Sequence, residues 1–288
     1  LYYLKKLCWQ ASDVLKAYAR GEDPPYGFQK YLSVKDGGDG PVSAADMAVN
    51  KLLISGLEEK FPLVDWNILS EESVKETTFQ NSGDKGNWQW ILDPLDGTRD
   101  FLQGSQNYSV HLALAYKKKP KIGVVLIPER DELWLGILGK GAWSENQKGI
   151  QKPVSFSNRE DISKLILVSS KNHKEKVLLN LIDEIAFGQT KNMGSVGCKV
   201  ASILRGESDV YISLSGKSFP KDWDMAAPQA LIEAAGGLFT HADGRSLSYE
   251  KPNYSQKGCL IASHGKSHEN ICKKIESFLS KNEPKYIL

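Results

Sequence analysis

The sequence has no long apolar run, since none of its apolar stretches approaches the length of about 18 residues that a helix needs to span a bilayer. The N-terminal segment 1–7 does not read as a secretory signal, because Lys5 and Lys6 interrupt its apolar residues. It is instead typical of the start of an amphipathic helix. We therefore expect no membrane-spanning helix and no membrane partner.

Cysteine is also scarce. The four cysteines are scattered along the chain, and none forms a Cys-x-x-Cys pair: they are Cys8, Cys198, Cys259 and Cys272. This spacing argues against a zinc site and against a disulfide framework. We expect free thiols in a reducing compartment, and hence a cytoplasmic location.

An excess of charge of one sign is missing as well, because the formal net charge is only +2. Such a chain has no bulk attraction to nucleic acid, so we expect no nucleic-acid partner, and any affinity for anions must come from a local site. The chain has 288 residues, of which 41% are hydrophobic and 25% charged. This length and composition suit one large domain or two closely packed halves with a sizeable core.

The order of the expected elements indicates the fold class. Strands and hairpins dominate the first half of the chain, whereas strands and helices alternate in the second half. This mixture predicts an α/β (α+β) fold in which helices and sheets are stacked in layers. We expect an N-terminal half at 1–157 and a C-terminal half at 158–288.

The most informative segment is 90–98, which reads Trp-Ile-Leu-Asp-Pro-Leu-Asp-Gly-Thr. An expected apolar strand ends there in two carboxylates, Asp93 and Asp96, followed by Gly97. Clustered oxygen atoms are the ligands that Mg²⁺ prefers, and a glycine lets the backbone approach a phosphate closely. The segment therefore predicts a site for a divalent cation and a phosphate, with the Leu95 carbonyl also turned towards the metal.

Five acidic residues are expected at the ends of elements: Asp46, Glu71, Asp93, Asp96 and Asp224. If they converge, they form a carboxylate cage suited to Mg²⁺. The alternative for each acid taken alone is a helix cap or a turn. A strand over 67–72 would point Glu71 and Glu72 to opposite faces, so that only one reaches the metal. Asp224 is expected to be the N-cap of a helix over 224–235.

Asp46 and Thr98 have a second possible relationship. A hydroxyl that donates a hydrogen bond to a carboxylate can accept a proton from water, and Glu71 and a metal beside it would help to generate the nucleophile. The other interpretation of Asp46 is a charge at a helix start that the helix dipole favours. The residues alone leave both interpretations open.

Two further groups of polar residues have open roles. The segment 193–199 precedes an expected helix, so it either caps that helix or offers N–H groups and Lys199 to a second anionic group of a substrate. Among the histidines, His111 is expected to be a buried core or rim residue. Solvated surface positions are expected for the others, which are His173, His241, His264 and His268.

These residues resemble the signature segments of the inositol monophosphatase superfamily, which comprises Mg²⁺-dependent, lithium-sensitive phosphatases. The segments occur in the order 41–46, 69–72, 90–98 and 222–227, and the resemblance spans about residues 4–279. Leu-Ser-Glu-Glu at 69–72 and Asp-Pro-Leu-Asp-Gly-Thr-Arg-Asp-Phe-Leu at 93–102 are most similar to the CysQ-type 3'(2'),5'-bisphosphate nucleotidases.

The resemblance implies a layered α-β-α-β-α sandwich of the inositol monophosphatase and fructose-1,6-bisphosphatase type, with a possible homodimer and two or three Mg²⁺ ions per active site. The implied metal ligands are Glu71, Asp93, the Leu95 carbonyl, Asp96 and Asp224. The implied water-activating residues are Asp46, Glu71 and Thr98. The implied substrate-binding residues are Glu71, Asp96, Gly97, Thr98, Arg99, Ser195, Lys199 and Asp224.

The activity implied by the resemblance is hydrolysis of the 3'-phosphate of adenosine 3',5'-bisphosphate (PAP) to AMP and phosphate in sulfur metabolism. The sulfated precursor PAPS would be a second substrate. The first alternative is an inositol-1-phosphate or fructose-1,6-bisphosphate phosphatase with the same machinery. The second is a catalytically inactive regulator that binds nucleotide or phosphate, and the retention of all five acids argues against it.

Overall fold

The computed structural model describes residues 1–30, 35–37, 40–76, 86–171, 176–214, 219–249 and 251–287. Most strands belong to two mixed sheets. The seven-stranded sheet has the order β3 (Asn67–Ser70), β4 (Trp88–Asp96), β5 (Ser109–Tyr116), β6 (Lys119–Ile127), β7 (Glu132–Ile137), β8 (Gly141–Glu145) and β9 (Gln151–Pro153). The five-stranded sheet has the order β11 (Gln189–Met193), β10 (Ile166–Ser170), β12 (Val210–Leu214), β14 (Cys259–Ser263) and β13 (Leu238–His241). A short hairpin pairs β1 (Lys35–Gly37) with β2 (Gly40–Val42).

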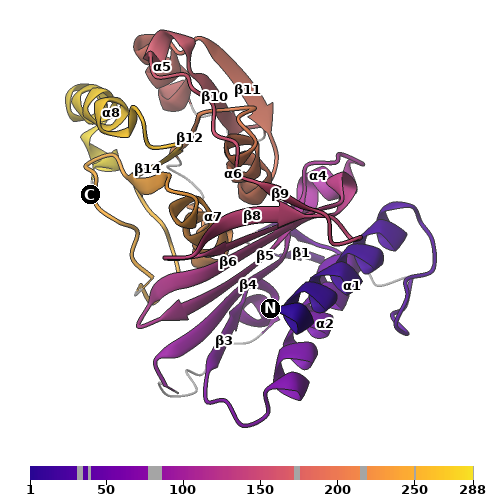
Figure 1. The fold of residues 1–288 in the computed structure, drawn as a ribbon. Helices are drawn as coiled ribbons and strands as arrows, with labels where there is room; N and C mark the ends of the chain where they lie inside the picture. The colour runs from indigo at the N-terminus through magenta and orange to yellow at the C-terminus, as the bar shows by residue number, and fades with distance from the viewer. Residues whose placement is uncertain are drawn as a thin grey trace.

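The helices fill the layers around these sheets. They are α1 (Tyr2–Ala19), α2 (Ala44–Lys60), α3 (Glu71–Glu76), α4 (Thr98–Leu102), α5 (Lys176–Ile185), α6 (Val196–Leu204), α7 (Asp222–Ala234) and α8 (His268–Asn282). Three short 3₁₀ helices are η1 (Pro128–Arg130), η2 (Ile162–Lys164) and η3 (Pro284–Tyr286). Helices α1 and α2 cover one face of the large sheet, α6 and α7 lie between the sheets, and α5 and α8 cover the far face of the small sheet (Figure 1).

Three buried clusters of apolar side chains hold these five layers together. One joins α1 and α2 to the outer face of the large sheet, the second joins both sheets through α6 and α7, and the third joins the small sheet to α5 and α8. Successive residues of a strand face opposite sides, so Trp90 and Leu92 belong to the outer cluster and Ile91 to the central one. The predicted α-β-α-β-α sandwich is confirmed.

Helix α7 lies unusually close to the large sheet, and two glycines make this possible. A Cβ atom added at Gly123 would lie 2.4 Å from the Ala227 carbonyl oxygen, and one at Gly136 would lie 2.7 Å from Leu231 Cα. Any larger residue at either position would push the helix away from β6 and β7. This close approach brings the first turn of α7, with Asp224, to the end of β4.

Strand β4 is irregular where its carboxylates begin. Its register against β5 runs regularly up to Asp93, which lies opposite His111, and then shifts so that Asp96 lies opposite Ser109. Pro94 lies within this irregular stretch and has no N–H to donate to the ladder. The shift re-aims the strand, as bulges beside functional sites commonly do.

Several sequence predictions need correction. Strand β3 ends at Ser70, and Glu71 and Glu72 begin helix α3 instead of continuing the strand. The last strand of the large sheet covers Gln151–Pro153. Strands β1, β2, β11 and β13 were not predicted from the sequence. Strand β11 is an edge strand whose residues are all exposed or half-buried, so it shows no apolar alternation.

The histidine predictions are correct for one residue and wrong for three others. His111 is buried, as expected. The prediction of solvated positions is wrong for His241, His264 and His268, which are 7%, 4% and 4% exposed. His268 is held by Thr240 Oγ1 and Ser263 Oγ, each 2.8 Å from a ring nitrogen, and burial lowers the pKa of His268 to about 4. His173 lies outside the described residues.

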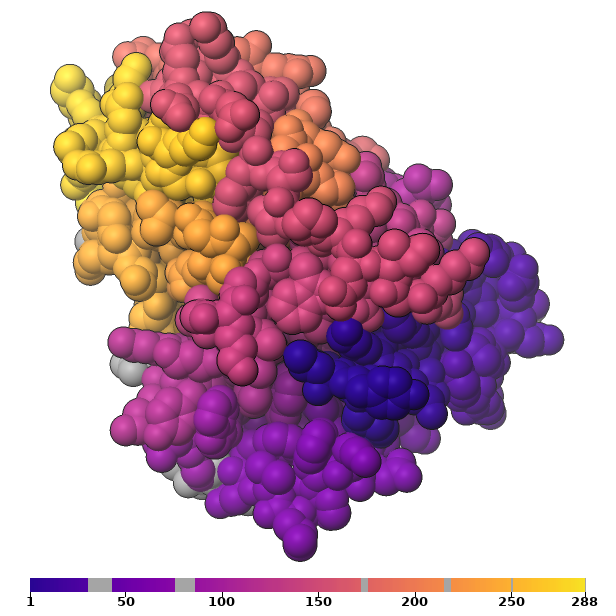
Figure 2. Space-filling view, in the orientation of Figure 1, coloured from indigo at the N-terminus to yellow at the C-terminus, as the bar shows by residue number. Residues whose placement is uncertain are grey.

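The two parts of the sequence occupy different regions of the molecule. Residues of the first half form the lower part of Figure 2, and the later residues form the upper part. The passage between the sheets lies between β9 and β10, and the division at 157 and 158 stays a prediction. None of the helices in the described part of the chain combines the length and apolarity that crossing a bilayer requires. All four cysteines are free thiols, and their side chains are buried.

Candidate functional site

The turn from β4 into α4 forms the centre of the candidate site. Gly97 is the N-cap of α4, and its φ of 94° lies in the left-handed region that glycine adopts without strain. A Cβ atom there would lie 3.0 Å from the Asn107 carbonyl oxygen, so there is little space for a side chain. The glycine therefore permits the sharp turn between Asp96, at the end of β4, and Thr98, at the start of α4.

Three carboxylates converge at this turn. Asp93 and Asp96 come from β4, and Asp224 comes from the first turn of α7. One oxygen atom from each lies within 4.8 Å of the others. Asp93 is buried, whereas Asp96 and Asp224 are half-buried. The predicted convergence of these three acids is thus observed, although Asp224 is the third residue of its helix region and not its N-cap.

The electrostatics of the cluster are unfavourable for charged carboxylates. Burial raises the pKa of Asp93 well above its ordinary value, and the charges of Glu71, Asp96 and Asp224 raise it further. Burial likewise raises the pKa of Asp224, with added repulsion from Asp96 and Glu71. Crowded anions in a buried place are stabilised by a bound cation, which is a property of metal sites.

Asp93 has one oxygen engaged and one free. Its Oδ1 accepts a hydrogen bond from the Leu95 N–H at 3.0 Å. Its Oδ2 is buried and receives no hydrogen bond from any of the described residues. A buried acceptor without a donor costs about 1–3 kcal/mol. An orphaned oxygen within a carboxylate cluster fits a hard divalent cation, whose preferred ligands are carboxylate oxygens.

Asp46 and Asp224 are held by the same local device. Asp46 Oδ2 accepts from the Ser43 N–H at 2.9 Å, and Asp224 Oδ2 accepts from the Lys221 N–H at 2.6 Å. Each acid is the third residue of its helix, and its carboxylate accepts from the backbone N–H of the N-cap residue. This arrangement uses Oδ2 of each carboxylate and leaves Oδ1 for other contacts.

Asp46 and Thr98 are in contact, as the sequence allowed. The Thr98 hydroxyl lies 3.0 Å from Asp46 Oδ1 and 3.1 Å from the Leu95 carbonyl oxygen. Burial raises the pKa of Asp46 to about 6, although hydrogen bonds from Ser43 and Thr98 lower it. Asp46 therefore caps α2 and also accepts a hydrogen bond from the Thr98 hydroxyl, so the contacts that both interpretations require are present.

Glu71 lies beside the cluster but has its own partner. Lys75 Nζ lies 2.8 Å from Glu71 and 3.0 Å from Glu72. Glu72 is buried, and burial raises its pKa to about 7 although Lys75 lowers it. Lys75 was not predicted as a partner of these acids, because its spacing of three and four residues from them is informative only on a helix, and a strand was predicted there.

Helix α6 begins directly on Asp96. Asp96 Oδ2 accepts hydrogen bonds from Ser195 Oγ at 2.7 Å, from the Gly197 N–H at 3.3 Å and from the Val196 N–H. Ser195 is the N-cap of α6, since its hydroxyl accepts from the Cys198 N–H. The segment 193–199 therefore caps its helix, and its first amides face a carboxylate of this chain.

The remaining predicted residues lie at different depths. Arg99 is exposed at the start of α4. Lys199 is buried, with Nζ 5.2 Å from the centre of the Tyr211 ring, and burial lowers its pKa although Asp96 raises it. Lys199 therefore differs from Arg99 in being closed off from solvent.

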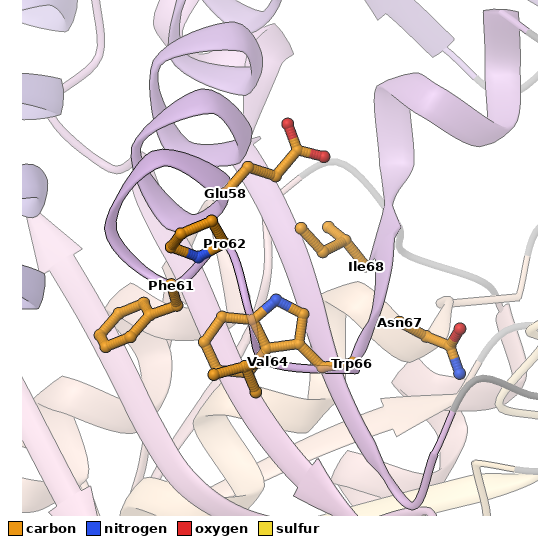
Figure 3. Close-up of a pocket in the computed structure, with 7 residues that line it drawn as sticks. All are labelled: Glu58, Phe61, Pro62, Val64, Trp66, Asn67 and Ile68. Carbon is orange, nitrogen blue, oxygen red and sulfur yellow. The ribbon is translucent and has the colours of Figure 1, made fainter.

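A surface hollow of about 490 Å³ lies elsewhere (Figure 3). Its lining residues come from the end of α2, the following loop and the start of β3, and they are Glu58, Phe61, Pro62, Val64, Trp66, Asn67 and Ile68. The acids lie at the opposite end of β3, beyond Ser70. The hollow contains none of the carboxylates described above and is separate from the candidate site.

Comparisons with known proteins agree with this geometry. Residues 1–280 match the inositol monophosphatase family. The chain is 29% identical to the 3'(2'),5'-bisphosphate nucleotidase CysQ of Salmonella typhimurium over 85% of this chain and 91% of that protein. It is 26% identical to inositol monophosphatase 1 of Bos taurus over 84% of this chain and 83% of that protein.

The fold has close counterparts among solved structures. A Thermotoga maritima IMPase superposes with a TM-score of 0.74 and 22% identity, covering 96% of each chain. The sequence match, the layered fold and the Asp93, Asp96 and Asp224 cluster lead to the same assignment. The chain belongs to the inositol monophosphatase family, whose members are metal-dependent phosphomonoesterases.

Proposed function

We propose that this protein is a Mg²⁺-dependent phosphatase that removes the 3'-phosphate of PAP, giving AMP and phosphate, and that it also accepts PAPS. The observation that carries the proposal is the cluster of Asp93, Asp96 and Asp224 at the turn of Gly97 and Thr98. These carboxylates, with Glu71 and the Leu95 carbonyl, would hold two or three Mg²⁺ ions. Bound Mg²⁺ supplies Lewis acidity and lowers the pKa of a water molecule.

The residues of this chain would position and deprotonate the attacking water. With its proton donated to Asp46 Oδ1, the Thr98 hydroxyl has lone pairs free to accept a proton from water. Asp46 then takes up the proton that Thr98 releases. A carboxylate whose pKa burial raises to about 6 is matched to proton uptake near neutral pH. Glu71, at the start of α3, lies on the same side and would orient the water.

Phosphate binding would use the backbone of the tight turn. Gly97 and Thr98 begin α4, where the N–H groups of a helix start are not engaged within the helix. Arg99 is exposed beside them and would supply a cation. Ser195, which contacts Asp96, and Lys199 would lie towards the nucleoside side of the pocket. Asp224 and Asp96 would contact the substrate as well as the metal.

Two observations favour a substrate with a second anionic group. CysQ of S. typhimurium is similar over 91% of its length, and its name specifies bisphosphate nucleotides. In addition, Lys171 Nζ lies 3.8 Å from Asp100, two residues after Thr98, so a cationic side chain other than Arg99 lies near α4. The similarity to bovine inositol monophosphatase 1 supports inositol 1-phosphate as the alternative substrate, with the same machinery.

The substrate assignment is tested by measuring phosphate release with Mg²⁺ from PAP, inositol 1-phosphate and fructose 1,6-bisphosphate in parallel. We expect kcat/KM to favour PAP by about 100-fold, or about 2.7 kcal/mol in transition-state free energy. A preference for either sugar phosphate would keep the mechanism and replace the substrate. Absence of turnover on all three would instead favour a protein that only binds nucleotide or phosphate.

The role of Thr98 is tested by two substitutions. Thr98→Val removes the hydroxyl at nearly constant volume and should lower kcat by about 10²–10⁴-fold, the usual contribution of a positioned proton acceptor. Thr98→Ser keeps the hydroxyl and should retain most of the rate. The measurement is steady-state kcat with saturating Mg²⁺. Equal rates for the valine and serine variants would show that the hydroxyl takes no proton.

A further inference from the structure

Strand β5 places two hydrogen-bonding residues against the acids of β4. His111 lies opposite Asp93, and Ser109 lies opposite Asp96, across the register shift. Both residues are fully buried. In the family-based prediction neither has a role. Polar groups buried this deeply need partners, and these two find them in each other and in the start of α6.

The contacts form one continuous chain of hydrogen bonds. His111 Nδ1 lies 3.4 Å from the Trp223 carbonyl oxygen, and His111 Nε2 lies 2.8 Å from Ser109 Oγ. Ser109 Oγ lies 2.6 Å from Ser195 Oγ, which in turn lies 2.7 Å from Asp96 Oδ2. The chain thus runs from the backbone of α7 to the carboxylate of Asp96.

The side chains of this hydrogen-bonded chain supply one proton fewer than the number of contacts that they make. The Trp223 carbonyl can only accept. When a neutral His111 donates to it from Nδ1, His111 Nε2, which also lies 3.3 Å from Asp96 Oδ2, accepts from Ser109. Ser109 has then donated its only proton and can only accept from Ser195. The single Ser195 proton therefore has two acceptors within reach, Ser109 Oγ and Asp96 Oδ2.

The start of α6 packs directly against Ser109 and His111. A Cβ atom at Gly197 would lie 2.4 Å from both His111 Nε2 and Ser109 Oγ, so the backbone of α6 rests directly on the pair. The Gly197 N–H also donates to Asp96 Oδ2 at 3.3 Å. Substitution of Ser109 or His111 would therefore alter the position of Asp96 although no carboxylate residue is replaced.

We propose that Ser109 and His111 are positioning residues for Asp96, because they give the Ser195 proton a second acceptor and so reduce the number of hydrogen bonds that compete with a cation for Asp96 Oδ2. The inference rests on the proposed function, in which Asp96 is a metal ligand. A carboxylate that keeps a hydrogen bond from a hydroxyl donates less charge to a metal. Partners behind a metal ligand typically change metal affinity by about 10–100-fold when they are removed.

The test is the Kd for Mg²⁺, measured by calorimetric titration of MgCl₂ into the full chain. Ser109→Ala and His111→Leu remove the second acceptor and its support, and each should weaken Mg²⁺ binding by about 10–100-fold. His111→Gln keeps an oxygen that can accept from Ser109 and should bind nearly as tightly as the wild type. KM for the substrate at saturating Mg²⁺ should stay within about threefold for all of them.

A matched control is Ser202→Ala, which removes another buried serine hydroxyl, bonded to the Lys199 carbonyl within α6. It should leave the Kd for Mg²⁺ unchanged. Wild-type affinity in Ser109→Ala and His111→Leu, or an equal loss in Ser202→Ala, would overturn the inference while the proposed function stands. A wild-type chain that binds no Mg²⁺ would contradict the proposed function itself and this inference with it.

Discussion

Replacing Asp93 by Asn should remove most turnover and at the same time stabilise the metal-free protein. The asparagine keeps the oxygen that accepts from the Leu95 N–H, so the local turn remains supported. It removes a buried negative charge that Glu71, Asp96 and Asp224 repel. Where Asp93 is ionised, neutralising it should stabilise the fold by about 1.4 kcal/mol for each unit by which its pKa is raised.

The loss of activity has the same cause as the gain in stability. The free Asp93 Oδ2 is the oxygen best placed for a cation, because it is buried and accepts no hydrogen bond from the described residues. Its loss should lower kcat by about 10³-fold or more, which is about 4 kcal/mol of transition-state stabilisation. The melting temperature of the metal-free variant at pH 8 should rise by about 2–4 °C for each kcal/mol gained.

The matched control for this pair of effects is Asp183→Asn, which neutralises an exposed acid on α5. It should change neither kcat nor the melting temperature by a measurable amount, because surface substitutions usually stay within about 0.5 kcal/mol. A loss of both activity and stability in Asp93→Asn would show that Asp93 is structural. Unchanged activity would remove Asp93 from the proposed metal site.

The second large effect is a pH-dependent response to Mg²⁺. The pKa values of Asp93 and Asp224 are raised well above the ordinary value, chiefly by burial. The pKa of Glu72 and that of Asp222 are both raised to about 7. The folded state therefore binds more protons than the unfolded state at near-neutral pH. Its stability must then fall as pH rises through these folded-state pKa values.

Between pH 6.5 and pH 8.5, the metal-free protein should lose about 1–3 kcal/mol of stability. The window starts at pH 6.5 because the pKa of His268 is lowered to about 4, and its contribution has the opposite sign. That contribution is lost as pH falls below the ordinary histidine value of about 6.5. Above this pH the buried carboxylates dominate the slope.

Mg²⁺ should counteract this fall of stability with rising pH, because a cation binds the ionised carboxylates and competes with protons. An excess of Mg²⁺, about 10 mM, should therefore raise the melting temperature more at pH 8.5 than at pH 6.5. Thermal unfolding with chelator and with Mg²⁺, at matched ionic strength, measures both slopes. The same Mg²⁺ response at both pH values, or the same response in Asp93→Asn, would contradict cation binding at this cluster.

Local sequence patterns were sufficient for the part of the site that is continuous in the chain. The apolar residues before Asp93 predicted β4, and the glycine after Asp96 predicted a sharp turn, because both depend on neighbouring residues only. Thr98 was paired correctly with Asp46 from a chemical argument. The layered fold followed from the order of strands and helices, which the family resemblance supported.

The parts that failed depend on contacts between distant segments. Glu71 was assigned to a strand because four residues of alternation do not show where β3 ends. The burial of His268 was missed because its partners, Thr240 and Ser263, come from strands far away in the sequence. The Ser109–His111 pair was missed for a similar reason, since its importance lies in the approach of α6 and not in any local motif.

The placement of Asp224 on the central helix has a topological consequence. Asp93 and Asp96 belong to the first sheet, whereas α7 is reached only after the chain has built most of the second sheet. A cation shared by these residues would close a loop that contains the whole passage between the two sheets. In the unfolded chain such a closure costs entropy that grows slowly with loop length. The cation would thus act as a reversible cross-link between the two sheets. Its release would weaken the contacts between the sheets before either sheet unfolds.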